Sequence, residues 1–512
     1  MNQKKIQIIL FIGLLLAYLF FSVNLYKDYG VSWDEEKVYD LGKNAYKYLT
    51  SDFSNYSALQ YLNSNYNQYY NPIYPLILYS FNQNKSYEKQ HIINLLFFIP
   101  TVIISFIFLF FNKKYIKYAI LAPIFLLLNP RLLGNIPINS KDIPFATSFI
   151  ISCAAIYFTR SRHRLIYFLI LGLLFGLSQS LRLVGIVLLP IFVIFQVTLF
   201  LQAQEKLNTF NFLKNKLNTV FIQQLIISSV IIFIISVLIT FVTWPYLWLD
   251  SNNILEAVSS SYRFPSVAHV MFFGKIVNTT QIPAVQYLLV WLIITTPIFI
   301  IISIIASVLI NNKIKNNLYV FLVIVLAVNL LAFFILNPLI YDGMRHGLYL
   351  IPIISLLSTI SIIEIFQSLD KKRLIKILFI FLIVFNIGKL SINIVQLHPY
   401  QYLYFNEFIG GLKGAEKLFE TDYWGLGFKE AVLWLKSELR NDKAIKLIAT
   451  CGRPESSTYY FSSNMKWTDN FNKADYYICF THFKQQFRAS PDKIIHIVSK
   501  QGIPLIYVYK LK

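Results

Sequence analysis

Charged residues are scarce in this sequence. Asp, Glu, Lys and Arg make up 14% of the 512 residues, and hydrophobic residues make up 56%, whereas about a quarter of a soluble protein is charged. A soluble globular chain is therefore excluded. Acidic residues are the scarcest, because 25 oppose 46 basic ones and leave a formal net charge of +21. The basic residues lie in short connectors between apolar runs, so we predict an integral membrane protein without a nucleic-acid partner.

Cysteines and internal repeats are also lacking. Three cysteines, Cys153, Cys451 and Cys479, are too few for a disulfide scaffold, and their spacing matches no metal site. Cys451 and Cys479 can pair if the last hundred residues lie outside the cytoplasm. No segment repeats another, so the inverted-repeat signature of many secondary transporters is missing.

Long apolar runs are abundant. We count eleven, at 6–25, 91–111, 118–128, 143–158, 165–181, 183–200, 224–243, 287–310, 318–336, 347–365 and 374–394. The first lacks a cleavage motif and is taken as a retained anchor, and the third is short enough to be broken or partly re-entrant. With a cytoplasmic N-terminus, every connector rich in Lys and Arg falls on the cytoplasmic side. We therefore predict about eleven transmembrane helices and an extracytoplasmic C-terminus.

Abundant Ile, Asn, Lys and Tyr are typical of AT-rich bacterial genomes, so the expected location is the bacterial inner (cell) membrane.

The predicted fold class is a polytopic α-helical membrane protein with a small C-terminal extracytoplasmic α/β domain. Residues 1–394 form the transmembrane module, whose first outer loop covers 26–90. In that loop Val38, Leu41, Ala45 and Tyr48 recur at helical spacing, which predicts an amphipathic helix along the bilayer surface. Residues 395–512 alternate short apolar and polar stretches around a helical pattern near 427–440, which predicts the α/β domain.

An acidic stretch, Ser32-Trp33-Asp34-Glu35-Glu36, follows the first apolar run. Ser32 and Glu35 have capping-box spacing, which predicts a helix start with Asp34 in the first turn. Capping explains one or two of these acids, and the alternative is work as a general base or a cation ligand. A helix N-terminus stabilises a carboxylate and weakens it as a base, so burial or another acid would have to raise its basicity.

Two further polar positions open predicted spans. Asp142 is expected to N-cap the fourth span with Pro144 just inside, which leaves the neighbouring Lys141 without a structural explanation. Arg345 and His346 open the tenth span. An arginine there either snorkels to lipid headgroups or clamps a phosphate beside a helix N-terminus.

Other candidates lie on the same face by the predicted topology. Arg131 and Arg182 are exceptions to the cytoplasmic concentration of positive charge, so they are candidates for binding an anionic headgroup. Trp244 and Tyr246 belong to an aromatic run that is typical of a membrane interface and could also form a sugar-binding wall. Tyr400, at the exit of the last span, has the same two interpretations.

Several of these motifs occur in one order with matching topology. They are Asp34-Glu35, Asn129-Pro130-Arg131, Asn139-Ser140-Lys141-Asp142-Ile143-Pro144, Arg182-Leu183-Val184-Gly185, Thr243-Trp244-Pro245, Arg345-His346 and His398-Pro399-Tyr400-Gln401-Tyr402. The set resembles the bacterial relatives of the dolichyl-phosphate-mannose protein mannosyltransferases, polytopic glycosyltransferases of the GT-C class. The resemblance runs through the membrane part into the start of the tail, but this chain lacks an evident large β-rich domain in an internal loop.

The resemblance implies transfer of a sugar from a polyprenyl-phosphate donor to an acceptor hydroxyl outside the cell, with inversion. The acceptor class (protein, lipid or glycan) stays open. Asp34 would be the general base, with Glu35 in support and Asp142 as a second acid. The leaving phosphate would be neutralised by basic residues, namely Lys141, Arg131, Arg182, Arg345 and His346, while Trp244, Tyr246 and Tyr400 would contact substrate.

The sequence leaves open whether the protein needs a metal ion, and it allows two other functions. Some members of the class hold a divalent ion, Mg²⁺ or Mn²⁺, at paired acids and others do not, so the need for a metal is undecided. A transporter or flippase of a lipid-linked saccharide is the alternative function. It predicts ionisable residues at mid-membrane depth, and the predicted spans are nearly free of them. A membrane anchor for the tail domain is a third interpretation, which leaves the acids and arginines unexplained.

Overall fold

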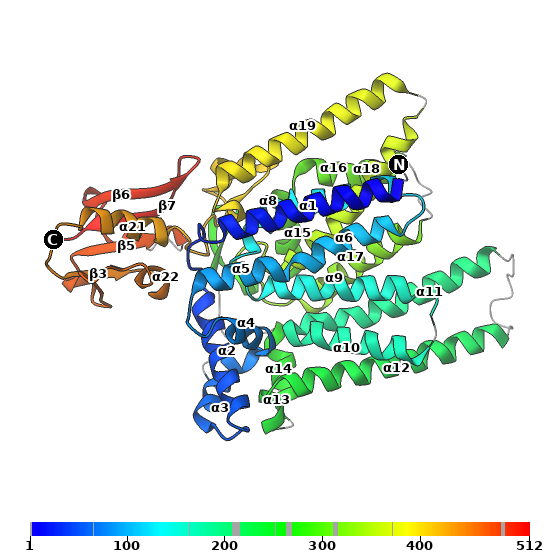
Figure 1. The fold of residues 1–512 in the computed structure, drawn as a ribbon, viewed down its shortest axis with the longest axis horizontal. Coiled ribbons are helices and arrows are strands. Elements are labelled where there is room, and N and C mark those ends of the chain that lie inside the picture. Colours follow the sequence, from blue (N-terminus) through cyan, green and yellow to red (C-terminus); the bar gives the residue numbers. More distant parts are fainter. Residues whose placement is uncertain are drawn as a thin grey trace.

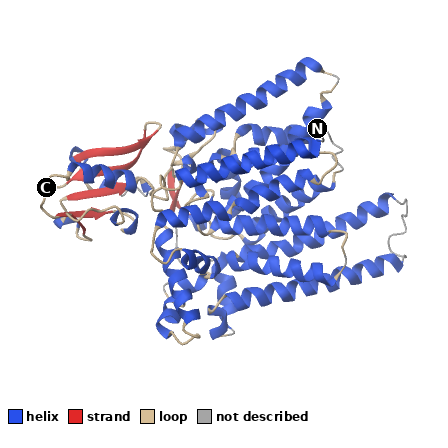
Figure 2. Ribbon diagram, in the orientation of Figure 1, coloured by secondary structure: helices blue, strands red, loops and turns tan. Residues whose placement is uncertain are grey.

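The structure is a computed structural model. It describes residues 3–64, 66–162, 164–206, 216–250, 252–262, 269–310, 316–370, 372–482 and 487–512. A bundle of long helices is joined at one end to a small domain with a β-sheet, and the N-terminus lies toward the opposite end of the bundle (Figures 1 and 2).

The long helices of the bundle are mostly apolar. They are α1 (Gln3–Leu25), α5 (Tyr87–Phe97), α6 (Ile99–Phe110), α9 (Asp142–Thr159), α10 (Leu165–Leu181), α11 (Leu188–Lys206), α12 (Lys216–Thr243), α15 (Ala284–Thr295), α16 (Ile298–Ile310), α17 (Asn317–Leu336), α18 (Ile351–Ser368) and α19 (Arg373–Leu397). Short helices join them, namely α7 (Leu121–Leu127), α8 (Pro130–Asn135) and the 3₁₀ turns η2 (Ile116–Tyr118), η3 (Leu183–Val187) and η5 (Arg345–Leu350).

Eight helices in the described residues are long and apolar enough to cross a membrane. They correspond to eight of the eleven apolar runs, and α5 with α6, η3 with α11, and η5 with α18 each count as one span. The eighth run is the pair α15 and α16, which bends by 108° at Thr296 and Pro297. The fifth run is α10, an apolar helix of 17 residues, and the third contains only the seven-residue α7. The chain is thus a polytopic helical protein, and the count of eleven spans stays a prediction.

The first loop folds into three helices and a 3₁₀ turn, at the bundle end that carries the C-terminal domain (Figure 1). These are α2 (Glu35–Thr50), α3 (Tyr56–Leu62), η1 (Asn67–Tyr69) and α4 (Ile73–Phe81). The amphipathic pattern is confirmed, because all four predicted apolar positions of α2 are buried. This apolar face packs on α3 and α4, and the position of α2 along the bilayer surface stays a prediction. Gly42 permits the contact, since a Cβ there would come within 2.0 Å of the Pro75 carbonyl oxygen.

A second group of short elements lies between α12 and α15. It contains α13 (Tyr246–Leu249), α14 (Asn252–Tyr262), the antiparallel pair β1 (His269–Phe272) and β2 (Lys275–Asn278), and η4 (Thr279–Gln281). In Figure 1, α13 and α14 lie at the same end of the bundle as α2 and α3.

The C-terminal domain is built on a five-stranded sheet in the order β4-β3-β5-β7-β6. Strand β3 pairs in parallel with β4 and β5, whereas β7 pairs antiparallel with β5 and β6. The elements are η6 (Gln401–Leu403), η7 (Glu407–Ile409), α20 (Gly411–Ala415), α21 (Phe428–Glu438), β3 (Lys446–Thr450), α22 (Glu455–Thr458), β4 (Met465–Trp467), η8 (Phe471–Lys473), β5 (Tyr476–Phe480), η10 (Pro491–Lys493), β6 (Ile494–Lys500) and β7 (Ile503–Lys510). The predicted small sheet region with its helix is confirmed.

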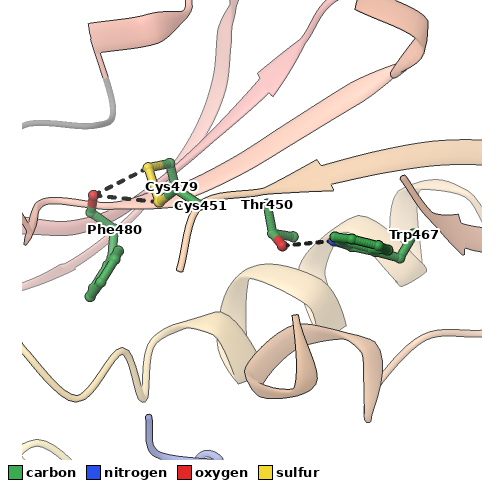
Figure 3. The surroundings of a disulfide bond; sticks show 5 residues. All are labelled: Thr450, Cys451, Trp467, Cys479 and Phe480. Carbon is green, nitrogen blue, oxygen red and sulfur yellow. Dashed lines mark hydrogen bonds between the residues drawn. A yellow bond between two sulfur atoms is a disulfide. The ribbon is translucent and has the colours of Figure 1, made fainter. Parts of the chain in front are cut away.

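A disulfide joins Cys451, directly after β3, to Cys479 in the neighbouring strand β5 (Figure 3). Both sulfur atoms lie near the carbonyl oxygen of Phe480, at 4.0 and 3.4 Å. Beside it, the indole N–H of Trp467 donates to the Thr450 hydroxyl across the β3–β4 pair. Cys153 stays free and buried in α9.

Candidate active site

Six charged residues from four segments meet where the helix bundle joins the C-terminal domain. We call them the charge cluster: Asp34, Lys141, Asp142, Arg182, Asp342 and Arg345. They come from the start of α2, the start of α9, the end of α10, and the turn that leads into α18. The structure therefore brings together five of the predicted site residues that lie far apart in the sequence.

Arg345 is the centre of the charge cluster. Its Nη2 lies 2.6 Å from an Asp34 oxygen, its Nε 3.3 Å from Asp142 and its Nη1 3.0 Å from Asp342. The guanidinium also lies 4.9 Å from the centre of the Trp424 ring. With five fixed N–H donors and a flat face, only an arginine can bind three carboxylates and stack on a ring in this way.

Lys141 and Arg182 supply the remaining positive charges. The Lys141 ammonium lies 3.1 Å from the second oxygen of Asp34, and Arg182 pairs with Asp142. Asn139 fixes Asp142 by donating to its carboxylate at 2.9 Å and accepting its backbone N–H at 2.9 Å. The prediction that Asp142 is the N-cap of this span is thus corrected: Lys141 is the N-cap and Asp142 is the first helical residue.

The charge cluster controls the protonation of Asp34. Burial alone would raise the pKa of Asp34, but the positive charges of Lys141 and Arg345 more than reverse this and hold it well below its usual range. The condition for a base at this position, that burial or another acid raises the basicity of Asp34, is therefore not met in this arrangement. Asp34 is a firmly ionised carboxylate whose oxygens are both occupied, which makes it a weak base.

Asp34 and Glu35 are adjacent but serve different purposes. Asp34 is the N-cap of α2, rather than a residue of its first turn as predicted. Glu35 is fully buried, accepts the Ser32 backbone N–H at 2.6 Å and lies 2.9 Å from Nε2 of His91. The Ser32 hydroxyl donates to the carbonyl of Ile138 at 3.0 Å, which ties this loop to the one before Lys141. Half of the predicted capping box forms, and Glu35 positions the loop that carries Asp34.

Two of the predicted phosphate ligands, Arg131 and His346, are not part of the charge cluster. Arg131 is fully buried, donates to the Tyr404 carbonyl at 3.2 and 2.8 Å, and lies 4.7 Å from the Phe405 ring. It ties α8 to the segment after α19 and is not brought to the charge cluster by any described contact. The His346 ring lies 5.1 Å from that of Tyr341, next to the charge cluster, and its Nε2 has no hydrogen-bond partner in the described part of the chain.

The three predicted substrate-binding aromatics have protein partners. Trp244 donates its indole N–H to the Gln68 carbonyl at 3.0 Å, Tyr246 donates to Glu256, and Tyr400 donates to Glu430 at 3.0 Å. In the described ranges, none of their contacts reaches the charge cluster. Their role in substrate binding stays a prediction.

Sequence reasoning missed four residues of this site, namely Lys37, Tyr70, Asp342 and Trp424. The ammonium groups of Lys37 and of the predicted Lys141 lie 4.6 and 4.4 Å from the centre of the Tyr70 ring, while Asp342 and Trp424 contact Arg345. Lys37 lies one turn after Asp34, which was an available signal. Burial, opposed by Arg345, raises the pKa of Asp342 to about 6.

A divalent ion does not fit these carboxylates. The oxygens of Asp34 and Asp142 face guanidinium, ammonium and amide donors. Across the described residues, no three His, Cys, Asp or Glu side chains are placed to hold a metal ion. The guanidinium of Arg345 occupies the position between the carboxylates that a bridging ion would need.

The comparison with known proteins gives no family. No family model matches this chain, and no curated protein matches it.

Proposed function

We propose that the charge cluster is the active site of a membrane glycosyltransferase of the GT-C type. It would transfer a sugar from a polyprenyl-phosphate donor to an acceptor hydroxyl on the extracytoplasmic side of the bacterial cell membrane. One observation carries the proposal: three carboxylates share Arg345, and Lys141 and Arg182 each pair with one of them, in a largely buried cluster at the ends of long apolar helices. Ionisable groups in such a place are expensive and point to function.

The residue types suit the reaction. The bond between the anomeric carbon and the phosphate oxygen breaks, and its electron pair stays on the phosphate. A bond from the acceptor oxygen to that carbon forms on the opposite side, and the acceptor proton goes to Asp34. Phosphate is already a good leaving group, so cations that stabilise its charge are the larger requirement. Arg345, Lys141 and Arg182 meet that requirement, since arginine and lysine are the usual partners of phosphate oxygens.

Binding of the donor phosphate would make Asp34 a stronger base. A phosphate beside Lys141 and Arg345 competes with Asp34 for the same N–H donors. As these cations turn toward the phosphate, their hold on Asp34 weakens and the pKa of its carboxyl rises. Asp34 would then accept a proton only when a donor is present.

The remaining residues receive supporting roles. Arg182 and Asn139 hold Asp142 beside Arg345. Asp142 therefore keeps the Arg345 guanidinium oriented when its ion pair with Asp34 breaks. Glu35 and Ser32 position the loop that carries Asp34. Trp424 supports the guanidinium of Arg345 from the C-terminal domain.

The test measures sugar release from a polyprenyl-phosphate sugar by the purified chain in liposomes, with a cell-envelope fraction as acceptor. We expect Asp34→Asn to lower the rate by about 10²–10⁴-fold, because general-base catalysis contributes that much. Glu36→Gln is the matched control, since Glu36 pairs with Lys85 at 2.7 Å outside the charge cluster. An Asp34→Asn protein that folds and transfers at the wild-type rate contradicts the base assignment. Donor movement across the bilayer without any glycosidic product would favour the transporter alternative.

A further inference from the structure

The segment that leads into Asp34 lies against the C-terminal domain. An added Cβ at Gly30 would come within 2.2 Å of the Leu426 carbonyl oxygen, so the two backbones are in close contact. The backbone N–H of Val31 donates to the Tyr460 hydroxyl at 3.1 Å. Asp34 therefore follows a stretch of chain that a domain from the far end of the sequence holds in place.

Trp33, the residue before Asp34, packs on the surface of that domain. Its ring stacks on that of Phe480, with 5.9 Å between centroids, and its centre lies 5.9 Å from the Arg453 guanidinium. Gly452 permits the contact, since an added Cβ there would come within 2.8 Å of a ring carbon of Trp33. We call Gly452, Arg453 and Phe480 the Trp33 socket.

The Trp33 socket is built on the sheet of the domain. Gly452 and Phe480 directly follow Cys451 and Cys479, which form the disulfide. Phe480 ends β5, is buried and packs on Phe428 of α21, with 5.6 Å between ring centroids. A covalent link and close packing restrict the movement of these residues, so the socket is a firm support for the loop.

The same domain also reaches Arg345, the cation that binds Asp34. The Trp424 carbonyl accepts the backbone N–H of Trp33 at 3.1 Å, and the Trp424 ring lies 4.9 Å from the Arg345 guanidinium. Asp422 accepts the backbone N–H of Trp424 at 3.1 Å, which fixes this turn. Arg345 in turn lies 2.6 Å from Asp34. The domain therefore contacts both the cation of this ion pair and the residue next to its carboxylate.

We propose that Trp33 is a positioning residue, through which the C-terminal domain sets the position of the Asp34 carboxylate beside Arg345. Trp33 and Asp34 share a planar peptide bond, so a movement of Trp33 in its socket turns the backbone that carries the carboxylate. The consequence for sugar transfer rests on the proposed function, in which Asp34 takes the acceptor proton. The C-terminal domain thereby takes part in building the active site without contacting the substrate itself.

Amide hydrogen exchange tests the positioning without any need for turnover. The Val38 N–H donates to the Asp34 carbonyl at 3.1 Å, so its exchange reports on the backbone at Asp34. We expect Trp33→Leu to speed exchange in the first turn of α2 about tenfold, because the loss of an aromatic contact is enough to shift an opening equilibrium by that factor. Trp33→Phe keeps a ring in the socket and should restore most of the protection. Mass spectrometry of the purified chain in detergent measures these rates.

Transfer kinetics test the consequence for catalysis. Trp33→Leu should lower kcat by up to about 10²-fold, since a misplacement of about 1 Å can cost that much. KM for the polyprenyl-phosphate donor should not rise, because Lys141 and Arg345 stay available to its phosphate. Gly452→Ala acts from the domain side, since the added Cβ would displace the Trp33 ring, and it should change exchange and kcat in the same direction. It replaces Trp33→Leu if that variant does not fold.

Tyr459→Leu is the control, because Tyr459 joins the C-terminal domain to α5 instead, with its hydroxyl donating to Glu88 at 2.7 Å. If it speeds exchange in α2 and lowers kcat as much as Trp33→Leu does, general loosening of the domain explains the effect and the positioning role is overturned. Unchanged exchange or unchanged kcat in a folded Trp33→Leu protein overturns it too. If the wild type transfers no sugar, the proposed function fails, and the exchange rates alone decide whether the domain holds Asp34.

Discussion

Buried carboxylates lie at both ends of the span that contains α18, but the two ends bind them in different ways. At its end, Glu364 accepts from the Tyr115 hydroxyl at 2.6 Å and pairs with Lys114 at 2.5 Å. The Glu364 side chain is 4% exposed and that of Lys114 is 46% exposed. At its start, Arg345 is 7% exposed and binds three carboxylates from three segments.

This difference indicates a structural role for the Glu364 pair and a chemical role for the charge cluster. Lys114 and Tyr115 are neighbours in the chain, and the lysine keeps its ammonium partly in solvent, so the Glu364 pair is inexpensive. The charge cluster buries its cations and anions together, where desolvation can exceed the attraction gained. A fold that needed only stability would place apolar side chains there. The arrangement is explained if a charged substrate completes it.

Removing the central cation should have the largest effect. Arg345→Gln leaves three carboxylates without their shared counter-charge, so we expect the free energy of unfolding to fall by about 3–5 kcal/mol. Lys114→Gln at the other end should cost only about 0–1 kcal/mol, because that lysine is half-exposed. Thermal unfolding in detergent measures both. Equal losses for the two variants would contradict the contrast between the two ends.

Asp342, at the end of the bundle next to the C-terminal domain, should make the free energy of unfolding depend on pH. Its pKa of about 6 in the folded chain exceeds the ordinary value of 3.8, so the folded state binds more protons between these values. Stability due to this group therefore decreases as pH rises from about 4 to about 6. In Asp342→Asn that contribution is absent, so the stability of the variant relative to wild type should rise by about 2 kcal/mol across this window. Unfolding midpoints between pH 4 and 7 measure it, and a flat difference would show that Asp342 titrates normally.

The support that Trp424 gives to Arg345 should have the smallest effect. Trp424→Leu removes the ring face at 4.9 Å and an indole N–H that donates to Asn135 at 3.2 Å. We expect a loss of about 1–2 kcal/mol in unfolding free energy. Trp434→Leu is the control within the domain, since Trp434 stacks on His496 instead. If both variants lose the same stability, Trp424 has no special relation to Arg345.

Local patterns in the sequence predicted much of this molecule. Hydropathy located the long helices, and the alternation of short apolar and polar stretches over 395–512 indicated the sheet of the C-terminal domain. The capping spacing predicted a helix start at Ser32, two residues before the observed N-cap Asp34. These features depend on residues close together in the chain, which is why sequence alone reveals them. Charge bias in the connectors also placed Asp34, Lys141, Asp142, Arg182 and Arg345 on one side of the bundle.

Local patterns could not predict the contacts between residues that lie far apart in the sequence. The separation between Asp34 and Arg345 is 311 positions, and nothing local shows that they pair and lower the pKa of Asp34. Arg131 had the same appearance in sequence as Arg182, but its guanidinium binds a backbone carbonyl at 2.8 Å. Trp424 and Arg453 come from a domain whose position against the first loop depends on packing around Trp33.

The central claim is that a lipid phosphate and Asp34 compete for Lys141 and Arg345. The direct measurement is the affinity of polyprenyl phosphate for wild type and for Asp34→Asn, with phosphate-free polyprenol as the reference ligand. The account predicts that Asp34→Asn binds polyprenyl phosphate more tightly than wild type while polyprenol binding is unchanged, because the substitution removes the competing carboxylate. Weaker or equal binding of polyprenyl phosphate by a folded Asp34→Asn protein would contradict it.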